Sequence, residues 1–151
     1  MFFNRPGKGL RKIRSFCFLV LFVSGCADVS SVQQVCYQNH CFEIEVAKTA
    51  EERTRGLQFR EFLPENKGML FVFEENRPYR FWMKDTLIPL DMIWLDEAKK
   101  AVHIEENVPP CTKDPCPTYG PSQKARYVLE VNAEKAKAAG IKQGVTLEFH
   151  L

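Results

Sequence analysis

Residues 80–95 decide the fold, and they read Arg-Phe-Trp-Met-Lys-Asp-Thr-Leu-Ile-Pro-Leu-Asp-Met-Ile-Trp-Leu. Two runs rich in aromatic and apolar residues, 80–84 and 90–95, flank a connecting segment that ends in Pro89. Runs of this length and composition are typical of β-strands. We therefore predict two strands joined as a hairpin.

The chain on both sides of this stretch adds strands of the same kind. Residues 42–46 alternate apolar and acidic side chains, and residues 69–73 form an apolar run typical of a strand buried on both faces. Strands are also expected at 101–105, 127–131 and 145–151, and helices at 49–57, with Thr49 and Glu52 as a capping box, and at 133–139, capped by Asn132. Because few helices separate the strands, we predict a mainly β fold, an antiparallel sandwich or barrel with two short helices.

The N-terminal residues resemble a bacterial lipoprotein leader. Five basic residues precede an apolar run at 16–23, which is too short to span a bilayer, since a helix needs about 20 residues for that. Val23-Ser24-Gly25-Cys26 then resembles a lipobox, which implies cleavage after residue 25 and lipid on Cys26. We therefore expect a leader at 1–25, a lipidated cysteine and tether at 26–40, and one domain at 41–151.

The leader also accounts for the positive charge of the chain. The full sequence carries a net charge of +2, and removal of residues 1–25 takes away five basic residues and no acidic residue, which leaves −3. The remaining chain lacks the basic surface expected of a nucleic-acid-binding protein, so we expect no nucleic-acid partner. The expected location is the cell envelope, and Ala27 after the lipidated cysteine favours the outer membrane, facing the periplasm.

Four cysteines remain beyond Cys26, in two pairs with the same spacing: Cys36 with Cys41, and Cys111 with Cys116. In an oxidising compartment this pattern favours two local disulfides, although four cysteines permit three pairings. The alternative is a zinc ion bound by four thiolates. His40, His103 and His150 lie on separate segments, so we expect no histidine metal site and no cofactor.

Four motifs occur in the same order along the chain. They are Arg53-x-x-Gly56-Leu57, the apolar run that follows Gly68 and ends at Phe73, the segment from Phe81 to Asp91 with Trp-Met-Lys-Asp-Thr at 82–86, and Tyr127-Val128-Leu129-Glu130-Val131. In this combination the chain resembles the domain of unknown function 192 family over residues 42–151. The resemblance implies a β-rich, jelly-roll-like fold, and it implies no established activity. Asp85 stands where the family usually has Asn, and Glu134 where Gly is common.

The Phe81-to-Asp91 stretch is the candidate ligand site. If Phe81 and Met83 face the core, alternation places Trp82 and Lys84 on the opposite face, where an aromatic ring beside an ammonium group suits a sugar or another polar ligand. The residues expected to contribute to this site are Arg53, Trp82, Lys84, Asp85, Thr86 and Asp91. A core role for the aromatic residues, with Lys84 and Asp85 as a surface pair, is the structural alternative.

Three functions fit this reading of the sequence. The leading hypothesis is a lipid-anchored module that binds a small molecule or glycan. A small hydrolase that uses Asp85 and Asp91 as paired carboxylates is the second, and a non-catalytic envelope scaffold is the third. No other catalytic motif is present in the sequence, so a role other than catalysis is favoured.

Overall fold

A computed structural model describes residues 32–151 of the chain. In this range the strands are β1 (Gln34–Tyr37), β2 (His40–Ala47), β3 (Lys67–Arg77), β4 (Phe81–Trp82), β5 (Leu90–Leu95), β6 (Ala101–Val108), β7 (Thr118–Tyr119), β8 (Ala125–Asn132) and β9 (Glu148–His150), and the helices are α1 (Ala50–Arg55) and α2 (Lys135–Ala138). None of these helices is long and apolar enough to cross a membrane.

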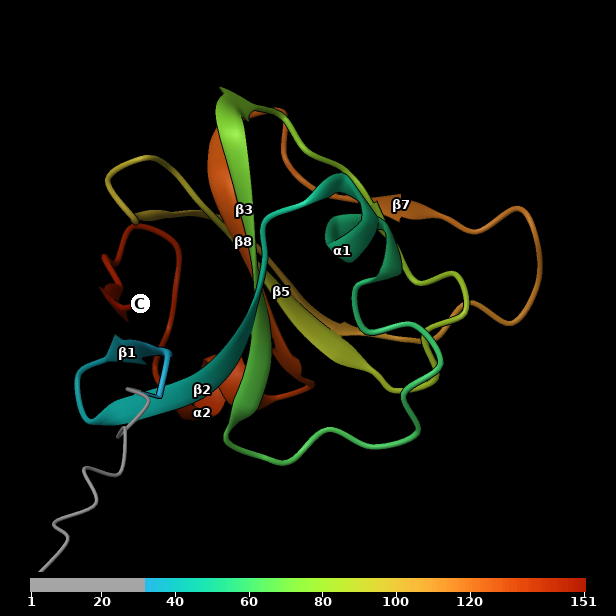
Figure 1. The fold of residues 1–151 in the computed structure, drawn as a ribbon, viewed down its shortest axis with the longest axis horizontal. Coiled ribbons are helices and arrows are strands. Elements are labelled where there is room, and N and C mark those ends of the chain that lie inside the picture. Colours follow the sequence, from blue (N-terminus) through green and yellow to red (C-terminus); the bar gives the residue numbers. More distant parts are fainter. Residues whose placement is uncertain (1–31) are drawn as a thin grey trace, which may run out of the picture.

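Seven strands form one curled sheet in the order β6-β5-β8-β3-β2-β1-β9, and β4 pairs with β7 in a second, smaller sheet. The curled sheet forms a half-barrel (Figure 1). Every pair in the large sheet is antiparallel except β2 with β3, which is parallel. The mainly β prediction with two short helices is therefore confirmed.

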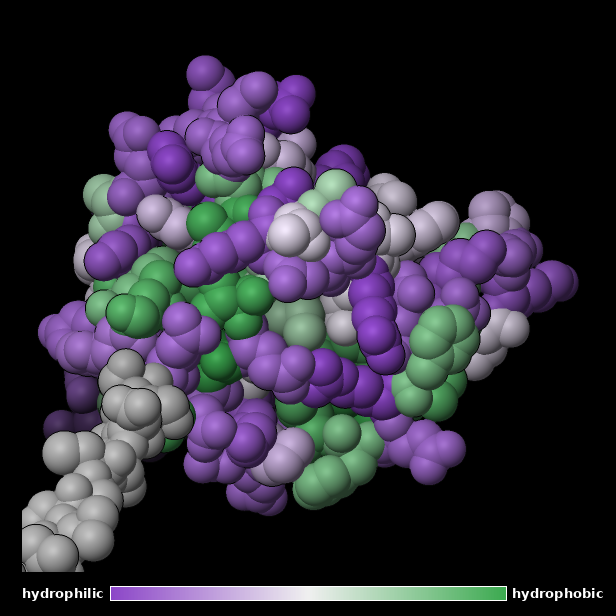
Figure 2. Space-filling model, viewed as in Figure 1, coloured by the Kyte–Doolittle hydropathy of each residue, from purple (hydrophilic) through white to green (hydrophobic). Residues whose placement is uncertain are grey.

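The sheet is covered on both faces, and each face has its own hydrophobic core. Along β3, Leu70 packs into the core beside α2, whereas Met69 and Phe71 pack into the core beside α1. Strand β5 alternates in the same way, with Ile93 in the first core and Trp94 in the second. This two-sided burial explains the continuous apolar runs in the central strands. Hydrophilic residues cover most of the face seen in Figure 2.

The predicted hairpin between residues 80–84 and 90–95 is wrong. Strand β4 ends at Trp82 and pairs with β7, whereas β5 pairs with β6 and β8. The chain turns after Met83, where Thr86 N donates to the Met83 carbonyl, and Asp85 has a left-handed backbone with φ of 56°. This turn separates the two strands, and apolar patterning does not specify which strand becomes a partner.

The helix predictions differ in outcome. Helix α1 begins with the expected capping box, because Thr49 Oγ1 accepts from Glu52 N at 3.2 Å and Glu52 Oε2 accepts from Thr49 N at 2.9 Å. Helix α2 is shorter than expected, and Asn132 does not cap it. Instead, Asn132 Nδ2 donates to the carbonyls of Leu63 and Pro64.

Two short strands were not predicted. Strand β1 lies within the expected tether and pairs with both β2 and β9, so the ordered sheet begins before residue 41. Strand β7 lies in the proline-rich loop and contributes only two residues. Both strands are short, and each has a partner that is distant in sequence, β9 for β1 and β4 for β7, which sequence periodicity does not reveal.

Candidate functional site

A cavity of about 40 Å³ lies between the end of α1, strands β3 and β8, and the β4 segment. In Figure 1, α1 lies over the face of the sheet formed by β3, β8 and β5. The residues that line the cavity are Arg53, Thr54, Arg55, Gly56, Leu57, Gln58, Phe71, Phe81, Trp82, Thr86 and Glu130. A wider groove of about 390 Å³ shares Arg53, Thr54, Phe81 and Trp82 with this cavity. The two hollows therefore form one continuous candidate site.

Among residues 32–151, Glu130 contributes the only carboxyl group in the lining of this cavity. It lies in the middle of β8, opposite Met69 of β3 and Met92 of β5. Because side chains alternate along a strand, Glu130 shares the α1-facing side of the sheet with Val128. Gly68 of β3 allows the backbones of β3 and β8 to lie close together at this point, since a Cβ on residue 68 would lie 2.5 Å from the Glu130 carbonyl oxygen. A carboxyl group is thus built into an otherwise apolar face.

The carboxyl of Glu130 has no partner within residues 32–151. The residue is only 5% exposed, and no hydrogen bond or ion pair to its carboxyl is present in this range. The two carboxyl oxygens are not fully shielded, because the buried side-chain atoms without a partner in this range are Asn76 Oδ1 and Arg126 Nε. Burial raises the pKa of Glu130 to about 8, from an ordinary value of 4.5, because the charged form loses its hydration. Glu130 is therefore mostly uncharged at neutral pH. Burial without a partner is uncommon for a glutamate and marks a candidate functional site.

Arg53 is held at the edge of the site by backbone carbonyls. Its Nη1 donates to the Lys48 carbonyl and, at 3.0 Å, to the Val72 carbonyl. Its guanidinium also lies over the ring of Phe73, 5.1 Å from the centroid. Three contacts fix the orientation of this cation, and none of them neutralises its charge.

Trp82 and Lys84 lie on the side opposite Phe81 and Met83, as the alternation of side chains along a strand predicts. Phe81 packs edge-on against Phe71 at 4.9 Å, and Met83 is buried. Trp82 is 51% exposed, and Lys84 Nζ lies 5.7 Å from the centre of its ring. The expected pairing of an exposed aromatic ring with an ammonium group is therefore present.

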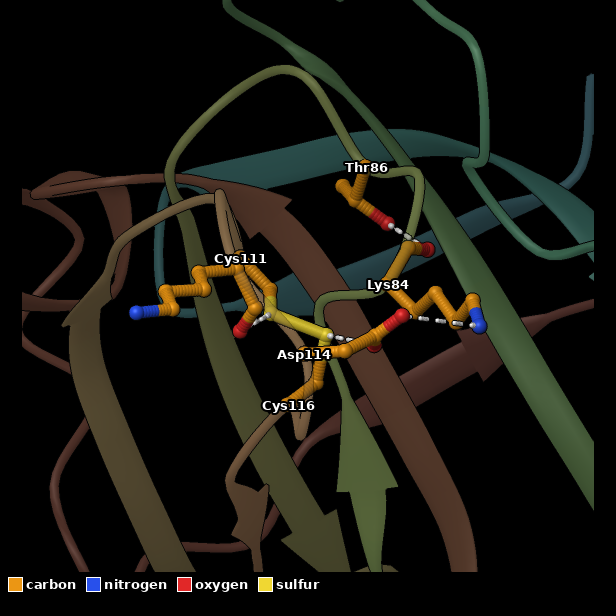
Figure 3. Close-up of a disulfide and its surroundings, with 6 residues drawn as sticks. Lys84, Thr86, Cys111, Asp114 and Cys116 are labelled. Carbon is orange, nitrogen blue, oxygen red and sulfur yellow. Dashed lines mark hydrogen bonds and ion pairs between the residues drawn. A yellow bond between two sulfur atoms is a disulfide. The ribbon is translucent and has the colours of Figure 1, made fainter.

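Lys84 also contacts the loop closed by the second disulfide. Its Nζ lies 3.6 Å from Asp114 Oδ2, next to the bond between Cys111 and Cys116 (Figure 3). Figure 3 shows Thr86 on the other side of Lys84, with its hydroxyl directed at the Lys84 carbonyl, 3.5 Å away. Thr86 is buried and lines the cavity, so it belongs to the candidate site.

Asp85 points away from this site. It is exposed and lines a separate hollow beside the second disulfide. Its φ of 56° and that of Glu134, 70°, place both residues in the left-handed region that Asn and Gly adopt more readily than other residues. The two departures from the family pattern thus fall where backbone conformation explains the usual Asn and Gly.

Asp91 does not join the candidate site. It is fully buried, and its Oδ1 accepts from Asn107 N at 2.8 Å while its Oδ2 accepts from Ala136 N at 2.9 Å. The second bond caps the start of α2, which has no side-chain cap of its own. Both carboxylate oxygens therefore have structural roles, and Asp91 does not form a solvent-accessible pair with the exposed Asp85.

The four cysteines form two disulfides, Cys36 with Cys41 and Cys111 with Cys116. The expected local pairing is confirmed, and the four-thiolate zinc alternative is wrong because no thiolate of these residues remains. Among residues 32–151, no group of three or more His, Cys, Asp or Glu residues could hold a metal ion. His103 Nε2 instead lies 2.8 Å from Glu105.

Glu130 is the residue that sequence reasoning missed. A signal was present, because a single carboxylate interrupts the apolar strand Tyr127-Val128-Leu129-Glu130-Val131. In the sequence analysis, the 127–131 motif was used only as part of the family resemblance. Alternation alone places Glu130 beside Val128 on a buried face, and this conflict between charge and burial could have identified it.

Two solved structures are similar to this chain. One is a protein from Sinorhizobium meliloti whose description suggests a transcription regulator, with 32% identity, a TM-score of 0.70, and coverage of 78% of this chain and 91% of that one. The other is a protein of unknown function from Novosphingobium aromaticivorans, with 31% identity, a TM-score of 0.69, and coverage of 80% and 89%. No curated protein gives a significant match.

The family comparison covers nearly all of the described residues. The model of the domain of unknown function 192 family, described as an uncharacterized ACR, matches residues 33–149. This match includes each motif that carried the resemblance, from Arg53 to Val131. The resemblance is thereby confirmed, and the chain belongs to the domain of unknown function 192 family.

Proposed function

We propose that this protein is a binding module for a small polar ligand, held at the bacterial cell envelope by lipid on Cys26. The observation that supports binding is Glu130, a nearly buried residue whose carboxyl has no partner in residues 32–151 and lines the same cavity as the half-exposed Trp82. A polar group buried without a partner is costly, and a ligand that hydrogen-bonds to it recovers that cost. Ligand sites commonly combine aromatic walls with a few polar groups of this kind.

A hydrolase is less well supported than a binding module. The two carboxylates proposed for catalysis do not lie together. Asp85 is exposed, whereas Asp91 is buried and accepts a backbone hydrogen bond at each oxygen. Glu130 brings one carboxyl group to the cavity, and the lining offers no second carboxylate. Acid-base cleavage of a glycosidic bond ordinarily requires two. Binding is therefore the function that these contacts favour.

The test of ligand binding uses the full chain, purified in mild detergent and immobilised on a column. A mixture of small polar compounds and short oligosaccharides is passed over it, and retention is measured by mass spectrometry. We expect retained compounds, and we expect Trp82→Ala to weaken their binding about tenfold, because a stacked aromatic contact contributes roughly 0.5–1.5 kcal/mol beyond the apolar area that it buries.

The matched control is Phe62→Ala, which removes another exposed aromatic ring, 74% exposed, that does not line the cavity or the groove. This variant should retain the same compounds as the unmodified chain. Equal retention by the Trp82→Ala column, or no retained compound on any column, would refute the binding proposal.

Lipid anchoring rests on residues outside the described range. Cys26 follows a basic segment, an apolar run and two small residues, and this order supports the proposal. Cells grown with an alkyne-labelled fatty acid should yield a labelled protein in the membrane fraction, and Cys26→Ser should lose both the label and the membrane location. An unlabelled wild-type chain would contradict the anchor.

A further inference from the structure

The groove beside Trp82 contains two arginines that are not paired with a carboxylate in residues 32–151. Arg53 and Arg80 both line it, and neither forms a salt bridge in this part of the chain. By contrast, nearby Arg77 pairs with Glu75 at 3.1 Å. The groove thus holds two cations that form no salt bridge in this range, although the Glu52 carboxylate lies close enough to Arg53 to attract it electrostatically.

Backbone and hydroxyl oxygens hold Arg80 in place, as carbonyls hold Arg53. The Nε, Nη1 and Nη2 atoms of Arg80 donate to Thr118 Oγ1 at 3.2 Å, to the Gly120 carbonyl at 2.8 Å and to the Thr118 carbonyl at 2.7 Å. A guanidinium has five N–H groups, so these neutral acceptors leave donors available on both arginines. The two cations are therefore pre-oriented and retain the capacity to bind a carboxylate.

The rest of the lining adds no negative charge. The groove is completed by Ala50, Thr54, Phe73, Tyr79, Phe81 and Trp82, none of which is acidic. In the adjoining cavity, the raised pKa of Glu130 leaves its carboxyl mostly uncharged at neutral pH. The electrostatic potential of the site therefore favours an anion.

The remaining groups indicate a ligand with a ring and hydroxyl groups. Trp82 is 51% exposed and lines both the groove and the cavity, and the ammonium group of Lys84 lies over its ring. Thr54 and Thr86 direct their hydroxyl donors to the carbonyls of Ala50 and Lys84, which leaves their oxygens as acceptors. A protonated carboxyl at Glu130 can both donate and accept. Sugars match this combination, because they stack on aromatic rings and carry several hydroxyl groups.

We propose that the groove binds a sugar that carries a carboxylate, such as a uronic acid residue of an oligosaccharide. The sugar ring stacks on Trp82, the carboxylate binds Arg53 and Arg80, and the hydroxyl groups point into the cavity that contains Glu130. This inference rests on the proposed binding function and specifies its ligand class.

The experiment compares acidic oligosaccharides with their own neutral forms. Calorimetry on the full chain in detergent would use oligomers of galacturonate, glucuronate and mannuronate, each beside its fully methyl-esterified form, which keeps the rings and linkages but removes the charge. At low salt we expect at least one acid to bind about tenfold more tightly than its ester. That difference should shrink as salt rises, because ions screen the attraction.

Variants assign the preference to the arginines. Arg80→Gln should remove most of the difference between acid and ester, and Arg80→Lys should keep part of it, since a lysine retains the charge without the planar fork. Arg77→Gln, on the same segment but outside the groove, should leave the difference unchanged.

Two outcomes would overturn the inference. Equal binding of acid and ester would show that the groove does not select for a carboxylate, and absence of binding by every oligouronate would exclude this ligand class. Neither result would refute the proposed binding function. That function is supported if the immobilised chain retains a different compound and the Trp82→Ala variant does not.

Discussion

The Glu130→Gln variant is expected to be more stable than the unmodified chain at pH 8, by several kcal/mol. Glutamine has nearly the same shape but cannot ionise. In the folded protein the pKa of Glu130 is about 8, whereas its ordinary value is 4.5. Between these pH values the folded state keeps a proton that the unfolded chain has released, so the free energy of unfolding decreases as pH rises.

The size of this effect follows from the pKa difference. Between pH 4.5 and about pH 8, the free energy of unfolding decreases by about 1.4 kcal/mol for each pH unit. Over the whole interval the decrease is on the order of 5 kcal/mol. The stability that depends on a protonated Glu130 is fully present below pH 4.5 and is lost as pH rises to about 8. Urea denaturation of both proteins from pH 4 to pH 9, with the disulfides intact, measures the difference directly.

The control for this prediction is Glu106→Gln, which changes an exposed glutamate on β6. Its free energy of unfolding should follow that of the unmodified chain at every pH. If the Glu130→Gln variant also showed the pH dependence of the unmodified chain, Glu130 would be ionised in the folded state at neutral pH, and the neutral-cavity argument would be wrong.

The second large effect is expected for Asp91→Ala, which should lower the free energy of unfolding by about 3 to 5 kcal/mol. The substitution leaves the buried amide of Ala136 and the partly buried amide of Asn107 without their acceptor, and a buried amide left unpaired costs roughly 1–3 kcal/mol. Asp91→Asn should cost less, because its amide oxygen can still accept one bond. Both values come from chemical denaturation at pH 7.

Asp96→Ala is the matched control for this effect. Asp96 Oδ1 also accepts two backbone bonds, from Ala98 N and Lys100 N, both at 2.9 Å, but these lie in an exposed turn. Water can replace the carboxylate there, so the expected cost is only about 1 kcal/mol. Equal losses for Asp91→Ala and Asp96→Ala would show that burial of the Asp91 bonds adds nothing.

Local interactions in this chain could be predicted from its sequence. The capping box joins Thr49 to Glu52, three residues further on, and needs no distant partner, so the start of α1 was predicted correctly. The two disulfides each close a loop between cysteines five residues apart, and the pairing followed from that spacing. The apolar run of β3 identified a strand buried on both faces, and the run at 90–95 identified β5 as a strand.

Interactions between distant residues could not be predicted in this way. Trp82 pairs with Thr118, and Asp91 of β5 caps a helix that begins at Lys135. No periodicity in the chain connects these positions. The candidate site was therefore only partly anticipated: Arg53, Trp82 and Thr86 line it, whereas Asp91 belongs to the interior and Glu130 was overlooked.

The pairing of β1 with β9 has a consequence for how the molecule is made. Residues 148–150 are synthesised after all the other described strands, and they pair with β1, the first strand described. Until they arrive, β1 presents an open edge to which other chains can add. The sheet cannot be completed progressively from the N-terminal side, so its final assembly waits until β9 has been synthesised.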